Sequence, residues 1–324
     1  MLQQTQVKTV LPFYPRFLER FPTPAALARA GTAQVLSAWS GLGYYRRARD
    51  LHAAAGLVVR EHAGRVPSDP EQFGRLPGIG RYTRAAVLSI GFGAKLAVLD
   101  GNVARVIARL GAIPGDLRTG ARWQQLQKTA DSFLAPRAAG DWNQAMMELG
   151  ATICTPRSPQ CLLCPVTEFC QARKLGLTDV IPEEQNKRAT LEITLAALVL
   201  VDPQGRTLLL PPPKSEAKPA PANDVAALLS RLWHFPTTQV QQDASGELRE
   251  FARRTIFSNR KFPGKLQALP KVRHAVTYRQ ITVLPFRLDV AKLPRVPHAK
   301  PLPLSDLSAV PVSNLTRKVA YASR

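Results

Sequence analysis

Four cysteines constrain the fold of this chain more than any other feature of its sequence. They fall within residues 154–170 with the spacing C-x6-C-x2-C-x5-C, and the chain has no others: Cys154, Cys161, Cys164 and Cys170. Such a segment can form two disulfides, a zinc site of four thiolates, or an iron–sulfur cluster site. Zinc sites usually pair two C-x-x-C units and this segment has one, so the spacing favours a [4Fe–4S] cluster over zinc.

The charge balance of the chain favours a polyanionic partner. Lys and Arg number 44 against 23 Asp and Glu, which gives a net charge of +21 and a pI near 10.6. Positive side chains that neutralise phosphates release counterions, so nucleic acid is the expected partner. No apolar run approaches the ~18 residues of a membrane span, and no basic region precedes an apolar core at the N-terminus. We therefore expect a reducing cytoplasm, which disfavours the two disulfides.

The chain divides into two predicted domains of different class. Residues 1–177 carry helical patterns separated by short breaks, and residues 178–190 lose this pattern and are expected to form a linker. Residues 191–315 begin with the apolar run LEITLAALVLVD and contain further β-type segments, which predicts an α+β domain. Residues 316–324 are expected to form a tail. The predicted fold class is therefore an all-α domain followed by an α+β domain.

A second motif lies in LPGIGRYTRAAVLSI, residues 76–90. Gly78 and Gly80 flank one apolar residue and precede a helical run. Glycines permit a tight turn, and the backbone N–H groups at the start of the next helix can face a phosphate. The same pattern also occurs in ordinary turns between helices. Further along, Asp100 in VLDGNVARV is either a functional carboxylate or the N-cap of the helix that follows it.

These motifs together resemble the helix-hairpin-helix superfamily of DNA glycosylases that includes endonuclease III. The stretches MLQQTQV, GLGYYRRARDLH, LPGIGRYT, LDGNVARV and NQAMMELGATIC are similar to the MutY family of adenine DNA glycosylases. The resemblance covers most of residues 1–175 and implies a [4Fe–4S] cluster, held by the four cysteines away from the site of hydrolysis. The lyase branch of the superfamily carries a nucleophilic lysine where this chain has Tyr82, so a glycosylase without lyase activity is implied.

The same resemblance assigns roles to residues of the helical domain. It implies hydrolysis of the N-glycosidic bond of an adenine that is flipped out of a duplex opposite 8-oxoguanine or G. Asp100 matches the catalytic aspartate that stabilises the sugar cation, and Tyr82 and Asn102 match polar groups beside it. Gln144 and Met147 match the adenine pocket, although ordinary core packing explains Met147 equally well. The residues expected to contact DNA in this domain are Leu2, Gln4, Tyr44, Gly78 and Gly80.

Two of these side chains are expected to distort the duplex. Gln4 matches the residue that enters the gap beside the lesion, and Tyr44 matches the aromatic side chain inserted next to 8-oxoguanine. Glycines at positions 41 and 43 would let the backbone approach DNA closely. Three arginines that follow are expected to bind phosphates: Arg46, Arg47 and Arg49.

The second domain resembles, more weakly, the MutT-like or Nudix-like domain that reads 8-oxoguanine in this family. The resemblance rests on LWHFP, residues 232–236, and on VRHAVTYRQITV, residues 272–283. The sequence has no catalytic Nudix box of clustered glutamates, so recognition without nucleotide hydrolysis is implied. Thr277 matches a hydroxyl that bonds the edge of 8-oxoguanine, whereas Val276 and Tyr278 depart from the Phe and His often found beside it.

The first residues carry the remaining expectation. MLQQTQV looks like the body of a helix, and in the family the general-acid glutamate lies two residues before the position of Met1. We therefore expect the reading frame to continue upstream. Two alternatives stay open: a catalytically impaired protein that binds lesions or mismatches, and a thymine-mismatch glycosylase of the same superfamily. The expected partner is double-stranded DNA with 8-oxoguanine:A or G:A mispairs, bound by a monomer in the cytoplasm at the nucleoid.

Overall fold

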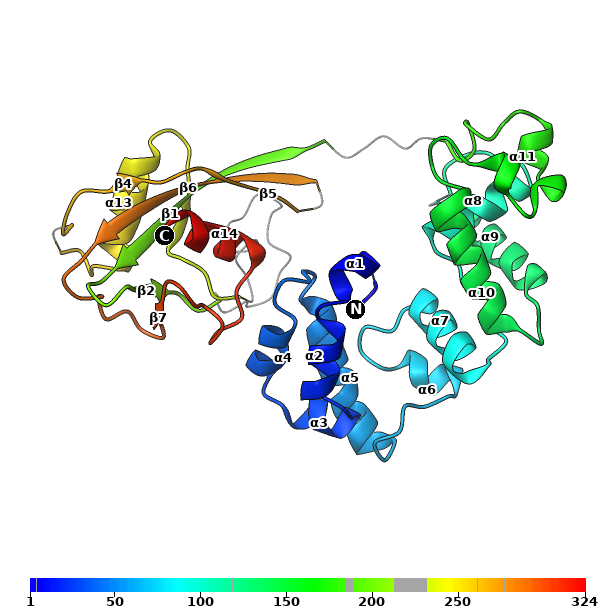
Figure 1. Cartoon of the computed structure of the whole chain (residues 1–324), viewed down its shortest axis with the longest axis horizontal. Coiled ribbons are helices and arrows are strands. Elements are labelled where there is room, and N and C mark those ends of the chain that lie inside the picture. The colour runs from blue at the N-terminus through cyan, green and yellow to red at the C-terminus, as the bar shows by residue number, and fades with distance from the viewer. Residues whose placement is uncertain (4, 118, 184–188, 213–231, 261, 277) are drawn as a thin grey trace. The chain divides into compact units, whose positions relative to one another are not determined.

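The chain separates into two compact units (Figure 1). The computed structural model describes residues 1–324 except 4, 118, 184–188, 213–231, 261 and 277. One unit combines Met1–His52 with Arg188–Arg324, and the other is Ala53–Lys187. The junction near residue 188 lies within the expected linker, whereas the junction after His52 lies inside a helix and was not expected. No described helix is long and apolar enough to cross a membrane.

The N-terminal part of the first unit is helical, as the sequence predicts. Thr23 caps its third helix by accepting a hydrogen bond from the Ala26 N–H at 3.1 Å, and Pro24 occupies the first helical position. Phe17 packs edge to face on Phe21 and Trp39, with ring centroids 5.0 and 5.8 Å away. The helices are α1 (Val7–Val10), α2 (Tyr14–Arg20), α3 (Pro24–Arg29), α4 (Thr32–Ala38) and α5 (Arg46–Glu61), which continues into the second unit.

Residues 1–3, 5 and 6 do not form the expected helix. α1 begins only at Val7, and its N-cap Gln6 makes no side-chain capping bond. The carbonyl groups of Met1 and Gln3 accept hydrogen bonds from the Arg47 side chain instead. These carbonyls would otherwise accept the first hydrogen bonds of a helix, so a tertiary contact replaces the local structure that the sequence pattern predicts.

The second unit is a helical domain with two hydrophobic clusters. Leu126 and Ile107 are fully buried in the larger cluster, and Leu88 is fully buried in the smaller one. Its longer elements are α6 (Pro70–Gly74), α7 (Arg81–Phe92), α8 (Gly101–Leu110), α9 (Gly120–Phe133) and α10 (Ala139–Glu148). The shorter ones are the π-helix η1 (Leu149–Ile153), the 3₁₀ turns η2 (Cys161–Leu163) and η3 (Thr167–Phe169), and α11 (Gln171–Lys174).

The first residues of the expected linker belong to this helical unit. Ile181 is buried in the same core as Leu126. Its carbonyl accepts a hydrogen bond from Arg109 Nε at 2.7 Å. The chain therefore leaves the helical core later than the loss of helical periodicity at residue 178 indicates.

The remainder of the first unit is an α+β fold, as predicted. Its main sheet has the strand order β3-β1-β6-β4, and β5 also pairs with β6. The long strands β1 (Leu191–Val201) and β6 (Arg279–Asp289) run parallel, and the other pairings in this sheet are antiparallel. The shorter strands are β3 (Thr237–Gln239), β4 (Gln267–Ala268) and β5 (Val272–Val276), and a separate sheet pairs β2 (Arg206–Leu209) with β7 (Lys300–Pro303).

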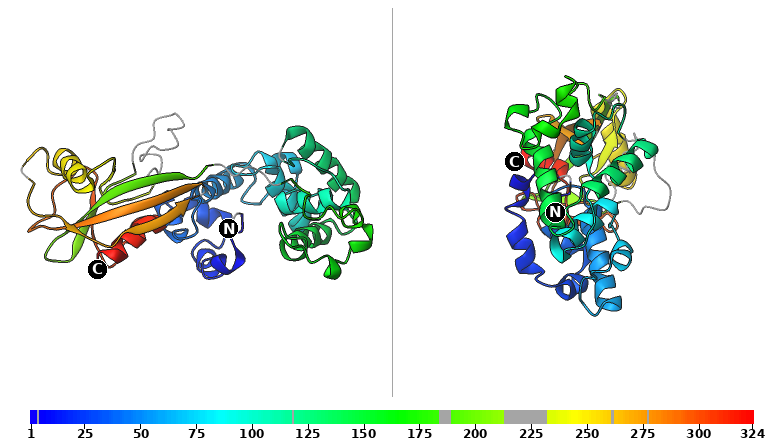
Figure 2. Two further views of the ribbon diagram at one scale, coloured as in Figure 1. Left: turned by 90° about the horizontal axis from the view of Figure 1, so that it is seen from above. Right: turned by 90° about the vertical axis from the view of Figure 1, so that its right-hand side faces the viewer.

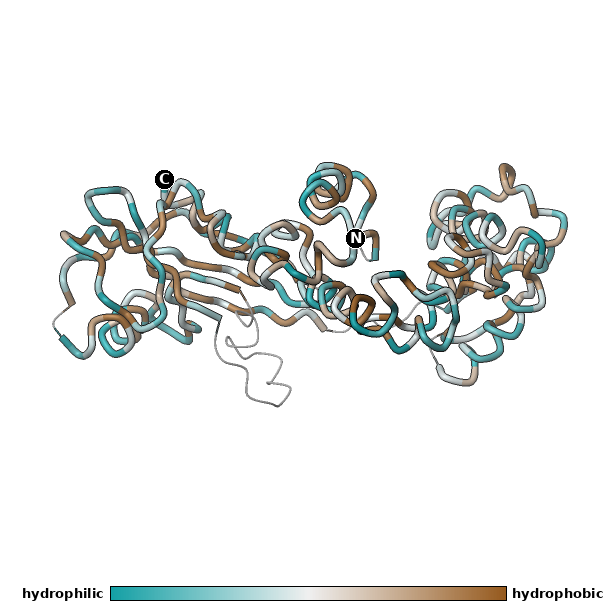
Figure 3. The backbone as a smooth tube through the Cα atoms, turned by 90° about the horizontal axis from the view of Figure 1, so that it is seen from below, coloured by the Kyte–Doolittle hydropathy of each residue, from teal (hydrophilic) through white to brown (hydrophobic). Residues whose placement is uncertain are grey.

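Both faces of the main sheet are buried. Helices α13 (Ala244–Thr255) and α14 (Asn314–Ala322) lie on opposite sides of the strands (Figure 2). Successive residues of β1 divide between the two resulting cores: Leu195 packs in the core that includes α14, and Leu198 in the core that includes α13. This double burial explains why β1 is almost continuously hydrophobic (Figure 3) and does not alternate with polar residues.

The C-terminal residues form a helix, so the expectation of a tail over residues 316–324 is wrong. Ser313 caps α14 by accepting a hydrogen bond from the Thr316 N–H at 3.0 Å. Leu315 and Val319 are one turn apart and are buried against the sheet. The segment is short and partly basic, but its apolar spacing gives it one face that only the sheet can cover.

Hydrogen bonds also join the helical and α+β parts of the first unit. The Ser40 and Tyr45 hydroxyls both donate to the Val312 carbonyl, at 2.9 and 3.1 Å. The Asn314 side chain donates to the Gly41 carbonyl at 3.1 Å. The loop over residues 41–45 is therefore attached to the segment that leads into α14.

Candidate functional site

The Leu-Pro-Gly-Ile-Gly segment forms a tight turn before α7. Gly78 has a φ of +78°, in the left-handed region that L side chains rarely adopt. Gly80 is the N-cap of α7, is exposed, and would place a Cβ atom in open space. The turn therefore leaves room for a phosphate to approach the start of α7.

Tyr82, Asp100 and Met147 lie close together in the helical unit. The Tyr82 hydroxyl, near the start of α7, donates a hydrogen bond to the Sδ atom of Met147 on α10 at 3.6 Å. Burial raises the pKa of the Tyr82 hydroxyl, and the nearby Asp100 carboxylate raises it further. The phenol therefore keeps its proton at neutral pH and can act as a hydrogen-bond donor.

Asp100 is the N-cap of α8, as one of the two sequence-based interpretations proposed. Its Oδ1 atom accepts a hydrogen bond from the Val103 N–H at 2.8 Å. Within the described part of the chain, Oδ2 has no hydrogen-bond partner. Capping fixes the carboxylate at the positive end of the helix dipole and leaves one oxygen for another group, so the structural and functional interpretations are compatible.

The buried amide of Asn143 holds the loop that leads to Asp100. Asn143 lies on α10, and its Oδ1 atom accepts a hydrogen bond from the Val98 N–H at 3.0 Å. Its Nδ2 atom donates to the Leu96 carbonyl and to the Ser89 hydroxyl of α7, both at 2.8 Å. Because residues 94–99 form no helix or strand, this one amide satisfies backbone groups that regular structure would otherwise pair.

A buried arginine connects the start of α8 with the cysteine segment. Arg105 Nη2 donates to Asn102 Oδ1 at 3.0 Å and to the Gly150 carbonyl at 2.7 Å. Its Nε atom donates to the Cys154 carbonyl at 2.8 Å. Gly150 of η1 approaches α8 so closely that a Cβ atom there would lie 2.9 Å from Asn102 Cβ. Arg105 therefore fixes the Asn102 side chain next to the backbone of Gly150.

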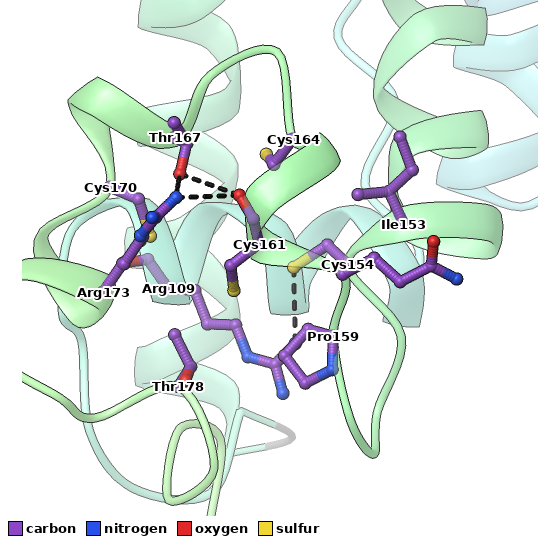
Figure 4. A pocket seen from close by; sticks show the side chains of 11 residues that line it. Arg109, Ile153, Cys154, Pro159, Cys161, Cys164, Thr167, Cys170, Arg173 and Thr178 are labelled. Carbon is purple, nitrogen blue, oxygen red and sulfur yellow. Dashed lines mark hydrogen bonds between the residues drawn. The ribbon is translucent and has the colours of Figure 1, made fainter.

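The four cysteines line a single pocket (Figure 4). All four are free thiols and partly exposed, so the disulfide alternative does not occur in this structure. Cys154 follows η1, Cys161 and Cys164 bracket η2, and Cys170 follows η3. Burial raises the pKa of the Cys164 thiol, and the other three cysteines raise it further because adjacent thiolates repel one another. A cationic group is therefore needed to hold four thiolates together.

Two arginines supply positive charge at this pocket. Arg109 Nη1 donates to Cys154 Sγ at 3.3 Å and to the Thr155 carbonyl at 2.7 Å. Arg173 Nη1 donates to the Cys161 carbonyl at 2.8 Å and to the Thr167 hydroxyl. An N–H bond to sulfur stabilises the thiolate form that metal binding requires.

The arrangement of the cysteines fits a cluster. Among the described residues, no three Cys, His, Asp or Glu side chains converge as ligands of one metal ion. In a [4Fe–4S] cluster each thiolate binds a different iron atom, so the four sulfur atoms stand farther apart than the ligands of one ion. Four thiols around one pocket, with two arginines beside them, fit this arrangement. When bound, the cluster ties the turns between Cys154 and Cys170 together.

Other expected site residues form no hydrogen bond with this group among the described residues, or are not described. Gln144 is exposed on α10 and its amide donates to the Gly140 carbonyl at 3.3 Å, with no hydrogen bond to Tyr82 or Asp100. Leu2 and Tyr44 belong to the first unit and are exposed. Gln4 and Thr277 lie outside the described residues.

Three residues that hold this site were not predicted from the sequence: Asn143, Arg105 and Arg109. A signal for the arginines exists in GNVARVIARL, where two charges four residues apart lie on an otherwise apolar helix that is almost wholly buried. A charge on a buried face needs acceptors from another segment. Nothing in the sequence around Asn143 shows that its partners are loop backbone groups.

Known proteins match both parts of this site. Residues 1–131 match the family described as HhH-GPD superfamily base excision DNA repair protein, and residues 154–170 match the iron–sulfur binding domain of endonuclease III. An adenine DNA glycosylase of Homo sapiens is 47% identical over 175 residues, which cover 54% of this chain and 32% of the human protein. An adenine DNA glycosylase of Mycobacterium tuberculosis is 43% identical over 178 residues, which cover 54% of this chain and 58% of the mycobacterial protein.

A solved structure shows a related likeness. A thermostable thymine-DNA glycosylase is 27% identical, with a TM-score of 0.49 over 54% of this chain and 80% of that one. This chain spans about a third of the human relative's length and somewhat over half of the mycobacterial relative's length.

The helical part of the chain thus matches the HhH-GPD base-excision repair superfamily over residues 1–131 and its iron–sulfur motif over residues 154–170. The curated relatives that this part of the chain matches are adenine DNA glycosylases. The resemblance indicated by the sequence motifs is confirmed. So is the expected cofactor: Cys154, Cys161, Cys164 and Cys170 form the [4Fe–4S] motif.

Proposed function

We propose that this protein removes adenine from DNA by hydrolysing its N-glycosidic bond when adenine is paired with 8-oxoguanine or G. The observation that carries the proposal is the proximity of Tyr82, Asp100 and Met147, beside a glycine turn open to phosphate. The curated relatives are adenine DNA glycosylases, which supports the choice of base.

The unbonded oxygen of Asp100 is the centre of the proposed chemistry. The target adenine must leave the base stack before its glycosidic bond can be reached. As the base departs, positive charge develops on the sugar, and a carboxylate close to it lowers the energy of that state. The hydrogen bond that Asp100 accepts from the Val103 N–H holds the carboxylate in place, so it requires little reorganisation during the reaction.

Tyr82 and Asn102 are assigned supporting roles. The protonated Tyr82 hydroxyl can donate a hydrogen bond toward the sugar or toward Asp100. A phenol at this position cannot form a Schiff base, so water completes the reaction and the strand is not cleaved. The Asn102 oxygen is occupied by Arg105, which leaves its amide N–H groups to orient water.

Other residues are proposed to select and hold the DNA. Gln144 and Met147 line the adenine pocket, and Gly78 and Gly80 admit a phosphate to the start of α7. Leu2, Gln4 and Tyr44 contact the distorted duplex. Residues 191–315 form a Nudix-like lesion-reading domain in which Thr277 bonds 8-oxoguanine. The protein acts as a monomer on the DNA of the nucleoid, for which its net charge of +21 is suited.

Single-turnover release of free base tests this proposal. The substrates are duplexes with A opposite 8-oxoguanine, A opposite T, and T opposite G, and Asp100→Asn is the control. We expect adenine release from the first duplex only, and none by Asp100→Asn, which should still bind it. Release of thymine from T opposite G, or binding to the lesion duplex with no release by the unaltered chain, would contradict the proposal.

A further inference from the structure

Arg47 is engaged inside the protein, although the sequence suggested that it binds phosphate. Its Nη1 atom donates to the Met1 carbonyl at 3.0 Å and to the Gln3 carbonyl. Its Nη2 atom donates to the Thr5 hydroxyl at 2.9 Å and to the Gly43 carbonyl at 3.5 Å. One guanidinium group therefore joins the opening segment, residues 1–3 and 5, to the glycine-tyrosine loop, residues 41–45.

The same guanidinium group lies over two aromatic rings. The Arg47 Cζ atom lies 5.6 Å from the ring centroid of Trp39 and 5.1 Å from that of Tyr44, distances typical of cation–π contacts. Trp39 is buried, and its Nε1 atom donates to the Gly43 carbonyl at 3.1 Å. The base of the loop is thus anchored in the core, and Arg47 supports the ring at its tip.

The glycine-tyrosine loop has a conformation that needs such support. Gly41 and Gly43 have φ values of +116° and +71°, and Tyr44 has a φ of +46°, which is unfavourable for a residue with a side chain. Such conformations persist when surrounding contacts hold them in place. Tyr44 nevertheless remains 49% exposed, and Leu2 on the opening segment is 58% exposed.

We propose that Arg47 is a positioning residue that holds these two segments as one rigid wedge, with Leu2 and Tyr44 as its exposed apolar parts. Proteins that kink duplexes insert such side chains between base steps, and an exposed aromatic ring stacks on a base of any sequence. A wedge that is ordered before binding loses less conformational entropy when DNA binds. The inference rests on the proposed function, since it assigns the lesion-dependent part of DNA binding to these residues.

Lysine cannot take over this role. Arginine offers five N–H donors in a planar fork and stacks flat on aromatic rings, whereas lysine is a point charge with one donor atom. The Arg47 contacts use two separate nitrogen atoms, and its Cζ atom lies over the Tyr44 ring. Arg47→Lys should therefore lose the contacts between the two segments as Arg47→Met does, although lysine keeps the positive charge.

Arg46 offers a matched control on the same helix. Its side chain is 81% exposed and forms an ion pair with Asp50 at 3.5 Å. Arg46→Met removes the same charge one residue away without touching either segment. It should weaken binding to all duplexes equally and reduce the dependence of affinity on salt.

The test compares these variants in the full chain carrying Asp100→Asn, so that base release does not interfere. Affinity is measured for duplexes with A opposite 8-oxoguanine and A opposite T, with 2-aminopurine beside 8-oxoguanine to report unstacking. We expect Arg47→Met and Arg47→Lys to lower the lesion preference about tenfold, the scale of one lost base-stacking contact. Arg47→Met and Arg47→Lys should also suppress the rise in 2-aminopurine fluorescence. Arg46→Met should preserve the lesion preference and the fluorescence rise.

Amide hydrogen exchange without DNA gives a second readout that does not depend on the proposed function. Peptides covering residues 1–6 and 41–45 should exchange faster in Arg47→Met than in Arg46→Met, while the helices keep their protection. Unchanged exchange in both peptides, or an equal loss of affinity for both duplexes, would overturn the inference. If the unaltered chain showed no lesion preference, the proposed function would fail, and exchange would still decide whether Arg47 joins the two segments.

Discussion

Replacing Asn143 with alanine would release the loop that leads to Asp100. The Asn143 side chain is 2% exposed, and its amide bonds the Val98 N–H, the Leu96 carbonyl and the Ser89 hydroxyl at 2.8–3.0 Å. Alanine would leave the two backbone groups without partners. A buried polar group without a partner costs ~1–3 kcal/mol, so we expect the loop to be destabilised by about 3 kcal/mol in total.

Amide hydrogen exchange measures this loss where it occurs. A destabilisation of that size corresponds to about a hundredfold faster exchange for the peptide over residues 94–100. Gln144→Ala is the matched control, because Gln144 is the next residue on α10 and is exposed. Its effect should stay within about 0.5 kcal/mol. Exchange over residues 94–100 as slow in Asn143→Ala as in the unaltered chain would refute the claim that this amide holds the loop.

Three further predictions concern the helical packing, the cluster and the response to pH. Gly150→Ala places a Cβ atom 2.9 Å from Asn102 Cβ, so it should lower the melting temperature of the helical unit. Gly91→Ala in α7 is the control and should not, because a Cβ atom there has no neighbour within 4 Å. Cys154→Ala should lower the iron content and the absorbance near 400 nm, and a variant with full iron would count against the ligand assignment. Burial lowers the pKa of His234 below its usual 6.5, so under acid conditions the unfolded chain takes up a proton more readily than the folded one. Stability of the first unit should therefore fall as pH decreases from about 6.5, and His234→Gln should flatten this part of a plot of melting temperature against pH.

Features that depend on local spacing were predictable from the sequence. The cysteine spacing indicated an iron–sulfur site because all four ligands lie in one short segment, Cys154 to Cys170. The turn at Gly78 and the N-cap at Asp100 were predictable for the same reason, since both depend on a few adjacent residues. The two fold classes followed from the helical periodicity of the first part and the β-type runs of the second.

The local sequence pattern predicted the wrong structure for two segments, the first residues and the last residues of the chain. The opening residues have a helical pattern, but Arg47 takes the carbonyls of Met1 and Gln3 as acceptors, and α1 starts later. Residues 316–324 were expected to form a tail. α14 is ordered because the sheet covers Leu315 and Val319.

The sequence by itself thus determined the cluster motif, the glycine turn, the capped carboxylate and the class of each domain, because each depends on neighbouring residues. Only the tertiary structure decided which side chains hold these parts in position. Asn143 bonds a loop 45 residues away, and Arg47 reaches Gln3, 44 residues away. The acceptors of such buried polar groups are mostly backbone carbonyls, which every residue carries, so no residue pattern identifies them before the chain has folded.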